Sequence, residues 1–141
     1  EEEREMNPYC VSTGVALQPW SPLARGILAG AYRGSMDGGT TNRSKGQDRA
    51  RTESLYRGEM DFAIADRVMN LADREGCRPA QIAIAWLLSK PGISSPVIGV
   101  SRIEQLTQLV EACSLELTEE DINYLEELYK PVENLLTLGT S

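Results

Sequence analysis

The residues best suited to chemistry in this sequence lie in two short segments, each of which follows an apolar run. The first segment, residues 19–26, reads Pro-Trp-Ser-Pro-Leu-Ala-Arg-Gly. Trp20 could present its flat face to a heteroaromatic ring, while the two prolines stiffen the turn and hold the Ser21 hydroxyl in place. A core tryptophan that closes the end of a barrel is the alternative interpretation of Trp20.

The second segment, residues 98–102, has the composition of an anion site. Gly99 allows a close approach of the backbone, Arg102 adds positive charge, and the N–H groups that begin the following helix would face a bound phosphate. Ser101 could instead be only an N-cap, and Arg102 an exposed residue of the first turn. Together the two segments suggest a nucleotide, with an aromatic ring at one end and phosphates further along.

A glycine-rich basic stretch follows the first segment. Residues 25–57 contain seven basic and three acidic residues, which gives +4 in a chain of formal net charge −7. We expect a long loop over 20–58. Loops of this length are usually functional or disordered, so the loop either closes on an anionic ligand or is only a solvated excursion.

Strands that alternate with helices must position these segments. The apolar run before Pro19 predicts a buried strand, and the run that begins at Pro96 predicts a second. Apolar residues at helical spacing predict a helix that ends at Gly76 and another that begins at Pro79. This order indicates an α/β fold with parallel strands, in which ligands bind at the carboxyl ends of the strands.

The remaining helices have recognisable starts. Ser101 and Glu104 have the spacing of a capping box, and Thr118 begins the last helix in a similar way. The inward faces of these two helices are expected to be Ile103, Leu106, Val110 and Cys113, then Ile122, Leu125, Leu128 and Tyr129. The predicted elements are a helix over 1–13, a strand over 14–19, a loop over 20–58, two helices over 59–90, a strand over 94–100, two helices over 101–130 and a tail over 131–141.

Composition excludes several classes of function. The chain has 141 residues, the size of one domain, with 21 acidic and 14 basic residues, which argues against a nucleic-acid binder. It has no histidine, so it cannot by itself supply a Ser-His-Asp or Cys-His site or a His-ligated metal.

Cysteine usage and hydropathy point to a cytoplasmic protein. The cysteines, at positions 10, 77 and 113, are far apart in the sequence, and we expect them to be reduced, small buried side chains in the cytosol. No apolar run approaches the ~18 residues of a membrane span.

Three longer motifs resemble the aldo-keto reductases, in the order and spacing of that family. Residues 14–26 resemble the seventh strand and its loop, residues 79–88 the seventh helix, and residues 96–106 the eighth strand and the start of the eighth helix. Residues 117–121 are similar to the start of the extra C-terminal helix, and residues 1–6 to the sixth helix. The resemblance covers almost the whole chain.

The resemblance implies the C-terminal portion of a (β/α)8 TIM barrel, with about two parallel strands, from an enzyme that reduces aldehydes or ketones with NADP(H). By position, Trp20 would stack on the nicotinamide and Arg43 would clasp the cofactor from the loop. The cofactor-binding residues that the resemblance implies are Trp20, Ser21, Pro22, Leu23, Ala24, Arg25, Arg43, Gly99, Ser101, Arg102, Gln105 and Gln108.

Some positions depart from the family pattern. Leu109 stands where members often carry Asn, and Ala31 where some carry Lys, which would weaken the contacts to the adenine. The catalytic Asp, Tyr, Lys and His of the family lie in the first half of the barrel, and no segment here matches them. The resemblance thus implies no catalytic residue in this chain, which would be inactive without the N-terminal half of the barrel or another chain.

Two alternatives of another class fit the same motifs. A non-catalytic module could sense nucleotide and regulate a partner, as the potassium-channel beta subunits of this fold do. A purely structural piece could pair with another chain, because two strands cannot close a barrel and their unpaired edges invite pairing.

Overall fold

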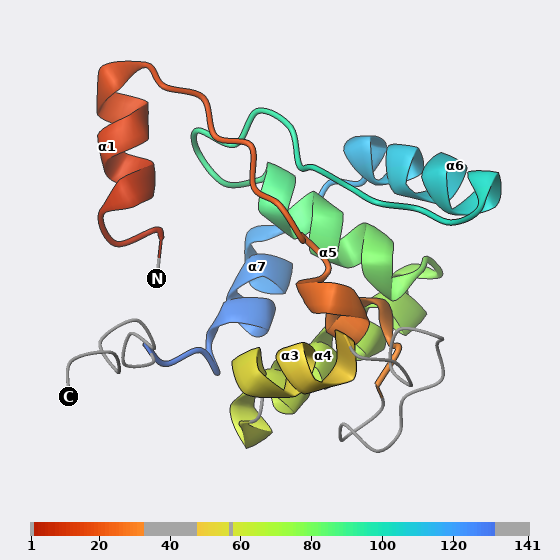
Figure 1. Cartoon of the computed structure of the whole chain (residues 1–141). Helices are drawn as coiled ribbons and strands as arrows, with labels where there is room; N and C mark the ends of the chain where they lie inside the picture. Colours follow the sequence, from red (N-terminus) through yellow and green to blue (C-terminus); the bar gives the residue numbers. More distant parts are fainter. Residues whose placement is uncertain (1, 33–47, 57, 132–141) are drawn as a thin grey trace, which may run out of the picture.

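The computed structural model describes residues 2–32, 48–56 and 58–131 (Figure 1). The helix α1 stands to one side of the body, and an extended segment connects the helix to the body. The elements in chain order are α1 (Met6–Thr13), the 3-10 helix η1 (Ala24–Ala29), α3 (Asp48–Leu55), α4 (Glu59–Glu75), α5 (Pro79–Leu88), α6 (Ile103–Glu111), the 3-10 helix η3 (Ala112–Ser114) and α7 (Glu119–Glu126).

The helices α4 and α5 form the centre of the body, and both were predicted from the sequence. Gly76 ends α4 in the left-handed conformation, at φ 65°, and Pro79 begins α5. Five consecutive residues of α5, from Gln81 to Ala85, are buried, so this helix packs on more than one side. The main core cluster consists of Val68, Leu71, Ala72, Ile82 and Leu125.

The two predicted strands pair in the predicted parallel direction, but only through isolated bridges. Leu17 bridges Ile93, and Trp20 bridges Val97. The expectation that the first strand is buried is wrong, since Val15 is 53% exposed. Within the described residues each segment has one neighbour, and a strand paired on one side leaves its other edge open.

The second segment packs against α1 at a glycine. Gly92, at φ 84°, lies where a Cβ atom would come within 2.9 Å of Val11 Cγ2 on α1. A larger residue here would adopt a strained left-handed conformation and would require the exposed Val11 side chain to move. The helix predicted over 1–13 begins later, at Met6, and is anchored by the buried Cys10.

The expectation of a continuous loop over 20–58 is wrong, because η1 and α3 lie within it. The sequence of α3 has little apolar periodicity. An ion pair between Arg49 and Glu53, 2.6 Å apart and one turn from each other, supports the helix, and Thr52 is fully buried. Residues 33–47, which include Arg43, lie outside the described part of the chain.

The predicted inward face of α6 is also wrong. Ile103 and Val110 are exposed, and so is Cys113, whereas Leu109 and Ala112 are buried against Ile84 of α5. The helix has two apolar stripes, and α5 covers only one of them.

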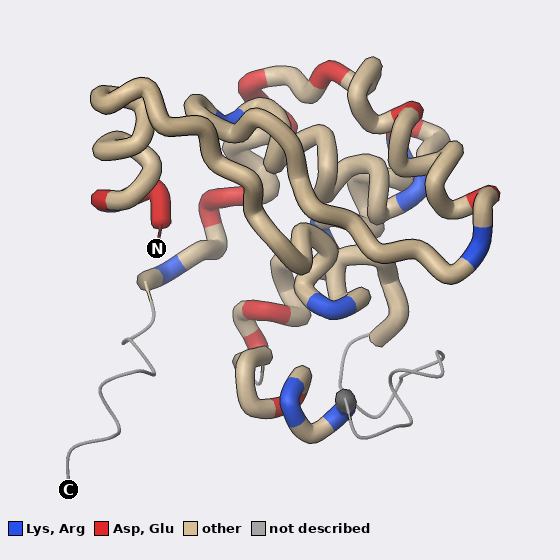
Figure 2. Tube along the Cα trace, turned by 45° about the horizontal axis from the view of Figure 1, so that its top comes forward, with Lys and Arg blue, Asp and Glu red and all other residues tan. Residues whose placement is uncertain are grey.

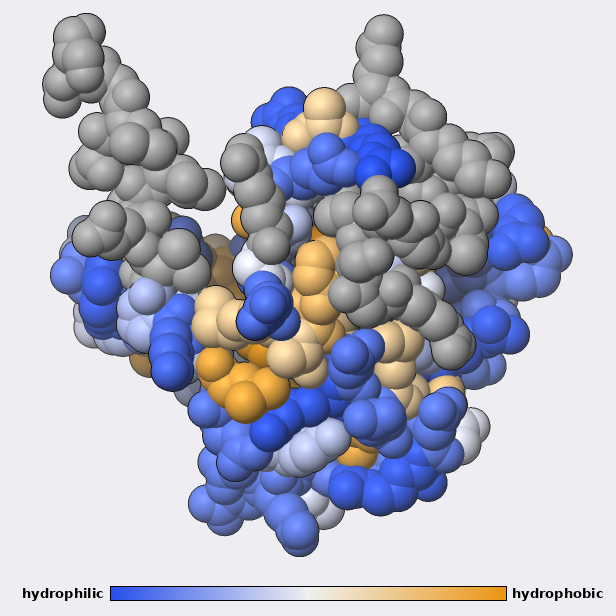
Figure 3. Space-filling view, turned by 90° about the horizontal axis from the view of Figure 1, so that it is seen from below, coloured by the Kyte–Doolittle hydropathy of each residue, from blue (hydrophilic) through white to orange (hydrophobic). Residues whose placement is uncertain are grey.

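Seen from below, the body gathers apolar residues at the centre of one face, among hydrophilic ones (Figure 3).

The last helix, α7, begins with the predicted capping box. Asp121 Oδ2 accepts hydrogen bonds from Thr118 N at 3.0 Å and from Thr118 Oγ1 at 2.7 Å. Leu125 is buried as expected, while Tyr129 is exposed.

Charged side chains of α4 hold α7 against the body. The Arg74 guanidinium donates to Asp121, and Arg67 stacks over the Tyr124 ring at 4.6 Å from its centroid. Arg67 also pairs with Glu127 at 2.5 Å. None of the helices in the described ranges combines the length and the apolar character that crossing a bilayer requires.

The buried cap of α7 predicts a pH-dependent loss of stability. Burial alone would raise the pKa of the Asp121 carboxyl, but hydrogen bonds from Thr118 and the charge of Arg74 outweigh it and hold that pKa below its ordinary value. The ionised carboxylate therefore stabilises the fold above the unfolded-state pKa of about 3.9, and this contribution is lost as the pH falls through the folded-state pKa.

Asp121→Asn should lower the free energy of unfolding by about 1–3 kcal/mol at neutral pH, and the deficit should shrink as the pH is lowered. Urea unfolding followed by circular dichroism at several pH values measures both. Glu120→Gln, an exposed change in the same turn, is the control. A deficit that stays constant with pH would contradict this explanation.

Candidate functional site

The turn that follows the first bridge has an unusual backbone. Ser21, Ala24 and Arg25 have positive φ values of 53°, 47° and 56°. A left-handed conformation is uncommon for residues other than glycine, and such strain clusters at functional sites. Backbone hydrogen bonds hold the turn, from Ala24 N to Ser21 O at 3.0 Å and from Gly26 N to Leu23 O at 2.8 Å.

The parallel bridges place this turn beside the end of the second segment. Leu17 N donates to Gly92 O at 2.9 Å, Ser94 N to Leu17 O at 2.9 Å, and Val97 N to Pro19 O at 2.8 Å. Residues 14–24 and 91–101 contain no charged side chain, and Figure 2 shows the two uncharged segments running side by side across the body.

A hollow of about 420 Å³ opens between the two segment ends. The indole of Trp20 forms one wall and is 69% exposed. An exposed tryptophan beside a hollow has a ring face available for stacking in the described chain. The hollow is lined by Trp20, Ser21, Pro22, Leu23, Arg25, Gly26, Val97, Ile98 and Gly99.

A second hollow of about 230 Å³ adjoins the first, because Leu23 and Gly99 line both. It runs along the start of α6 and the start of α5. Arg102, Gln105 and Gln108 line it, and so do Arg78 and Gln81 of α5.

The start of α6 differs from the predicted capping box, because the helix begins after Arg102 and Gln105 replaces Glu104 as the capping side chain. Gln105 Oε1 accepts hydrogen bonds from Ser101 N at 3.0 Å, Ser101 Oγ at 3.2 Å and Arg102 N at 3.2 Å. The carboxamide oxygen thus occupies the position in which the helix start would offer its N–H groups to an anion.

Positive charge gathers along the two hollows. Arg25 lines the first, and Arg78 and Arg102 line the second, whereas no carboxylate of a described residue lines either one. The chain as a whole carries a formal charge of −7, so the described lining of the groove has the opposite sign of charge from the whole chain. Such a groove attracts an anionic ligand.

Most of the predicted site residues therefore lie together. Ala24 lies in the strained turn but lines neither hollow, and Ser101 is exposed beside Gln105. Arg43 lies outside the described residues. Arg78 was missed by the sequence reasoning, although its position directly before Pro79 at a helix start was a usable signal.

Similarity to known proteins shows the family of this chain. The profile of the Aldo/keto reductase family matches residues 1–130. The chain belongs to the aldo/keto reductase family. Versiconal hemiacetal acetate reductase of Aspergillus parasiticus is 45% identical over 133 residues, a match that covers 93% of this chain and 37% of that protein. A protein of Schizosaccharomyces pombe named as a putative aryl-alcohol dehydrogenase is 46% identical over 137 residues. This match covers 94% of this chain and 36% of that protein.

A solved structure of the family shows a similar fold. A thermostable aldo-keto reductase in complex with the inhibitor epalrestat matches with a TM-score of 0.59 at 23% identity, covering 91% of this chain and 35% of the other. The chain thus spans little more than a third of the length of these relatives.

The strained turn leads to a test by substitution. Ala24→Gly should raise the free energy of unfolding by about 1 kcal/mol, since glycine adopts a left-handed conformation without the penalty that alanine incurs. Ala50→Gly on the exposed surface of α3 is the matched control and should lower it by about 1 kcal/mol. Urea unfolding of both variants measures the two changes, and an equal loss in both would show that residue 24 is unstrained.

Proposed function

We propose that this chain is the C-terminal, cofactor-holding part of a (β/α)8 aldo-keto reductase that reduces an aldehyde or a ketone with NADP(H). The groove carries the proposal, because it combines an exposed indole at one end with three arginines along its length and no described carboxylate. Membership of the family supports carbonyl reduction as the reaction class.

The described residues fit a dinucleotide in this groove. The Trp20 ring would stack on the nicotinamide, which supplies the hydride when the cofactor is bound. The turn at residues 21–25 would lie along the pyrophosphate, with the Arg25 guanidinium lining the same hollow. The two hollows meet at Leu23 and Gly99, so the ligand can pass from one to the other.

The start of α6 favours NADP(H) over NAD(H). Arg102 and Ser101 would hold a 2′-phosphate by charge-assisted hydrogen bonds. Gln105 would either share these N–H groups with the phosphate or release them, because its Oε1 atom accepts from them at 3.0–3.2 Å. Before the phosphate binds, these hydrogen bonds to Gln105 hold the backbone of Ser101 and Arg102 in place.

The proton donor must come from elsewhere, because the chain has no histidine and none of its described tyrosines lines the groove. Uncovered apolar side chains of the two segments, such as Val15 and Val97, suit contact with the N-terminal part of the barrel or with another chain. The three cysteines are unpaired, which fits a reducing compartment such as the cytosol.

Binding of NADPH tests the groove directly. NADPH should quench tryptophan fluorescence, and Trp20→Phe should remove most of the quenching. Arg102→Ala should weaken NADPH binding about tenfold, the effect of losing one charge-assisted hydrogen bond, and should leave NADH binding nearly unchanged. Arg4→Ala, a change at an exposed residue far from Arg102 in the sequence, is the control. Equal weakening of both nucleotides would contradict the assignment of Arg102 to the 2′-phosphate.

The chain by itself should have no reductase activity. In a preparation free of host reductases, an aromatic aldehyde should not increase the rate of NADPH oxidation above the rate without aldehyde. Among the described residues that line the groove, none carries a carboxyl, phenol or imidazole group that could protonate the carbonyl oxygen. The absorbance of the reduced nicotinamide follows the reaction. Steady, aldehyde-dependent oxidation would place a proton donor in this chain and contradict the proposal.

A further inference from the structure

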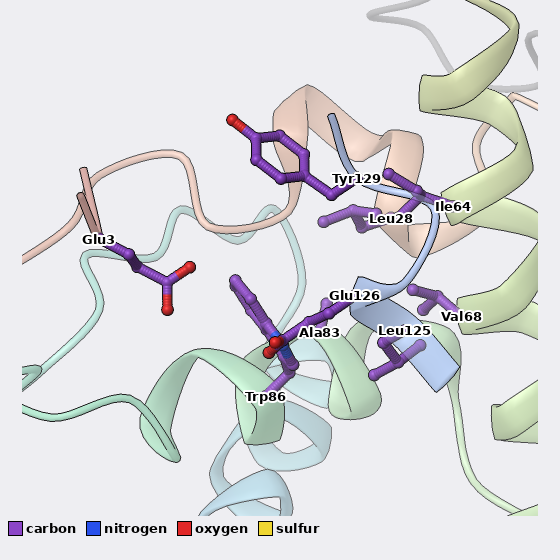
Figure 4. A pocket seen from close by; sticks show the side chains of 9 residues that line it. All are labelled: Glu3, Leu28, Ile64, Val68, Ala83, Trp86, Leu125, Glu126 and Tyr129. Carbon is purple, nitrogen blue, oxygen red and sulfur yellow. The ribbon is translucent and has the colours of Figure 1, made fainter. Parts of the chain in front are cut away.

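A separate cavity of about 360 Å³ lies beneath α7, away from the groove (Figure 4). Its volume is within the range of pockets that bind small molecules. Aliphatic side chains from four elements form one side of it, as Figure 4 shows. These side chains are Leu28, Ile64, Val68, Ala83 and Leu125.

The aromatic and charged residues of the cavity come from α5, from the end of α7 and the residues just after it, and from the residues before α1. Trp86 of α5 and Tyr129, just after α7, provide flat apolar surface, while Glu3 and Glu126 provide carboxylates. Trp86 Nε1 donates to Glu126 Oε1 at 2.7 Å, which fixes the indole and the carboxylate relative to each other.

The charge around this cavity is unbalanced. Lys90 Nζ contacts Glu3 Oε1 at 3.2 Å and also pairs with Glu126, so one ammonium serves two carboxylates. An adjoining hollow of about 250 Å³, which shares Glu3 and Trp86, adds the carboxylate of Glu2. Among the described residues that line the two hollows, three are carboxylates and one is a lysine.

We propose that this cavity binds an organic ammonium ion with an aromatic or branched apolar body. The apolar body would lie against the aliphatic side and the Trp86 ring. The ammonium group would lie against the carboxylates of Glu3 and Glu126, beside Lys90 Nζ, which contacts both of them. A cation there reduces the excess negative charge, and it gains from the face of an aromatic ring in the way that Lys90 does, whose Nζ lies 4.8 Å from the centroid of the Trp86 ring. A neutral ligand of the same shape would gain only the apolar contacts, and an anion would be repelled.

Nuclear magnetic resonance of the two indole N–H groups tests this site in the full chain. The probes are 2-(1-naphthyl)ethylamine, the neutral 2-(1-naphthyl)ethanol of the same shape, and the anionic 1-naphthylacetate. The amine should shift the Trp86 signal and leave the Trp20 signal in place, with Trp20→Phe assigning the two signals. The amine should bind at least about fivefold more tightly than the alcohol, and the acetate more weakly than either.

Two variants test the carboxylates. Glu126→Gln and Glu3→Gln should each weaken binding of the amine about fivefold and leave binding of the alcohol unchanged. Glu3 is exposed and lies outside α7, so its variant remains informative if Glu126→Gln loosens that helix. Glu120→Gln, the same charge change outside the cavity, should have no effect.

Three outcomes would overturn the proposal. Equal affinity for the amine and the alcohol would show a site for apolar groups only. A shift of Trp20 in place of Trp86 would assign the probe to the groove. The absence of any shift at millimolar amine would show that the cavity takes no ammonium ligand. Saturating NADPH should leave amine binding unchanged, which separates this site from the proposed cofactor site.

Discussion

Backbone pairing between the segment after α1 and the segment after α5 is the contact on which the groove depends. The bridges of Leu17 with Ile93 and of Trp20 with Val97 bring together residues that lie almost 80 positions apart. Because the pairing is parallel, both segments end at the same edge, where the strained turn meets the start of α6. Side chains reinforce the pairing, with Gln18 Nε2 donating to Ser95 Oγ at 3.0 Å.

Strain and charge are concentrated at that edge. Oppositely charged side chains of the body form ion pairs, such as Arg67 with Glu127 and Arg74 with Asp121. These two ion pairs hold α7 against α4. The groove collects arginines beside a turn with three left-handed residues. A strained turn beside positive charge is expected where an anionic ligand binds.

The sequence predicted the features that local signals decide. Gly76 and Pro79 mark the junction of α4 and α5, Thr118 marks the start of α7, and Trp20 and Gly99 mark the two ends that meet in the groove. Other features depend on tertiary packing. The exposed Ile103 and the buried Leu109 could not be distinguished, because both lie on apolar stripes of α6 and only α5 selects between them. The left-handed Ala24 carries no signal in its residue type, since glycine normally occupies such positions.

We propose that both segment ends contact one nucleotide. Two-dimensional ¹H–¹⁵N nuclear magnetic resonance of the chain during a titration with NADPH tests it most directly. The claim predicts that amide signals of residues 20–26 and of residues 98–108 shift together, with one dissociation constant, while signals of α7 stay in place. Shifts confined to one of the two segments, or shifts centred on α7, would contradict it.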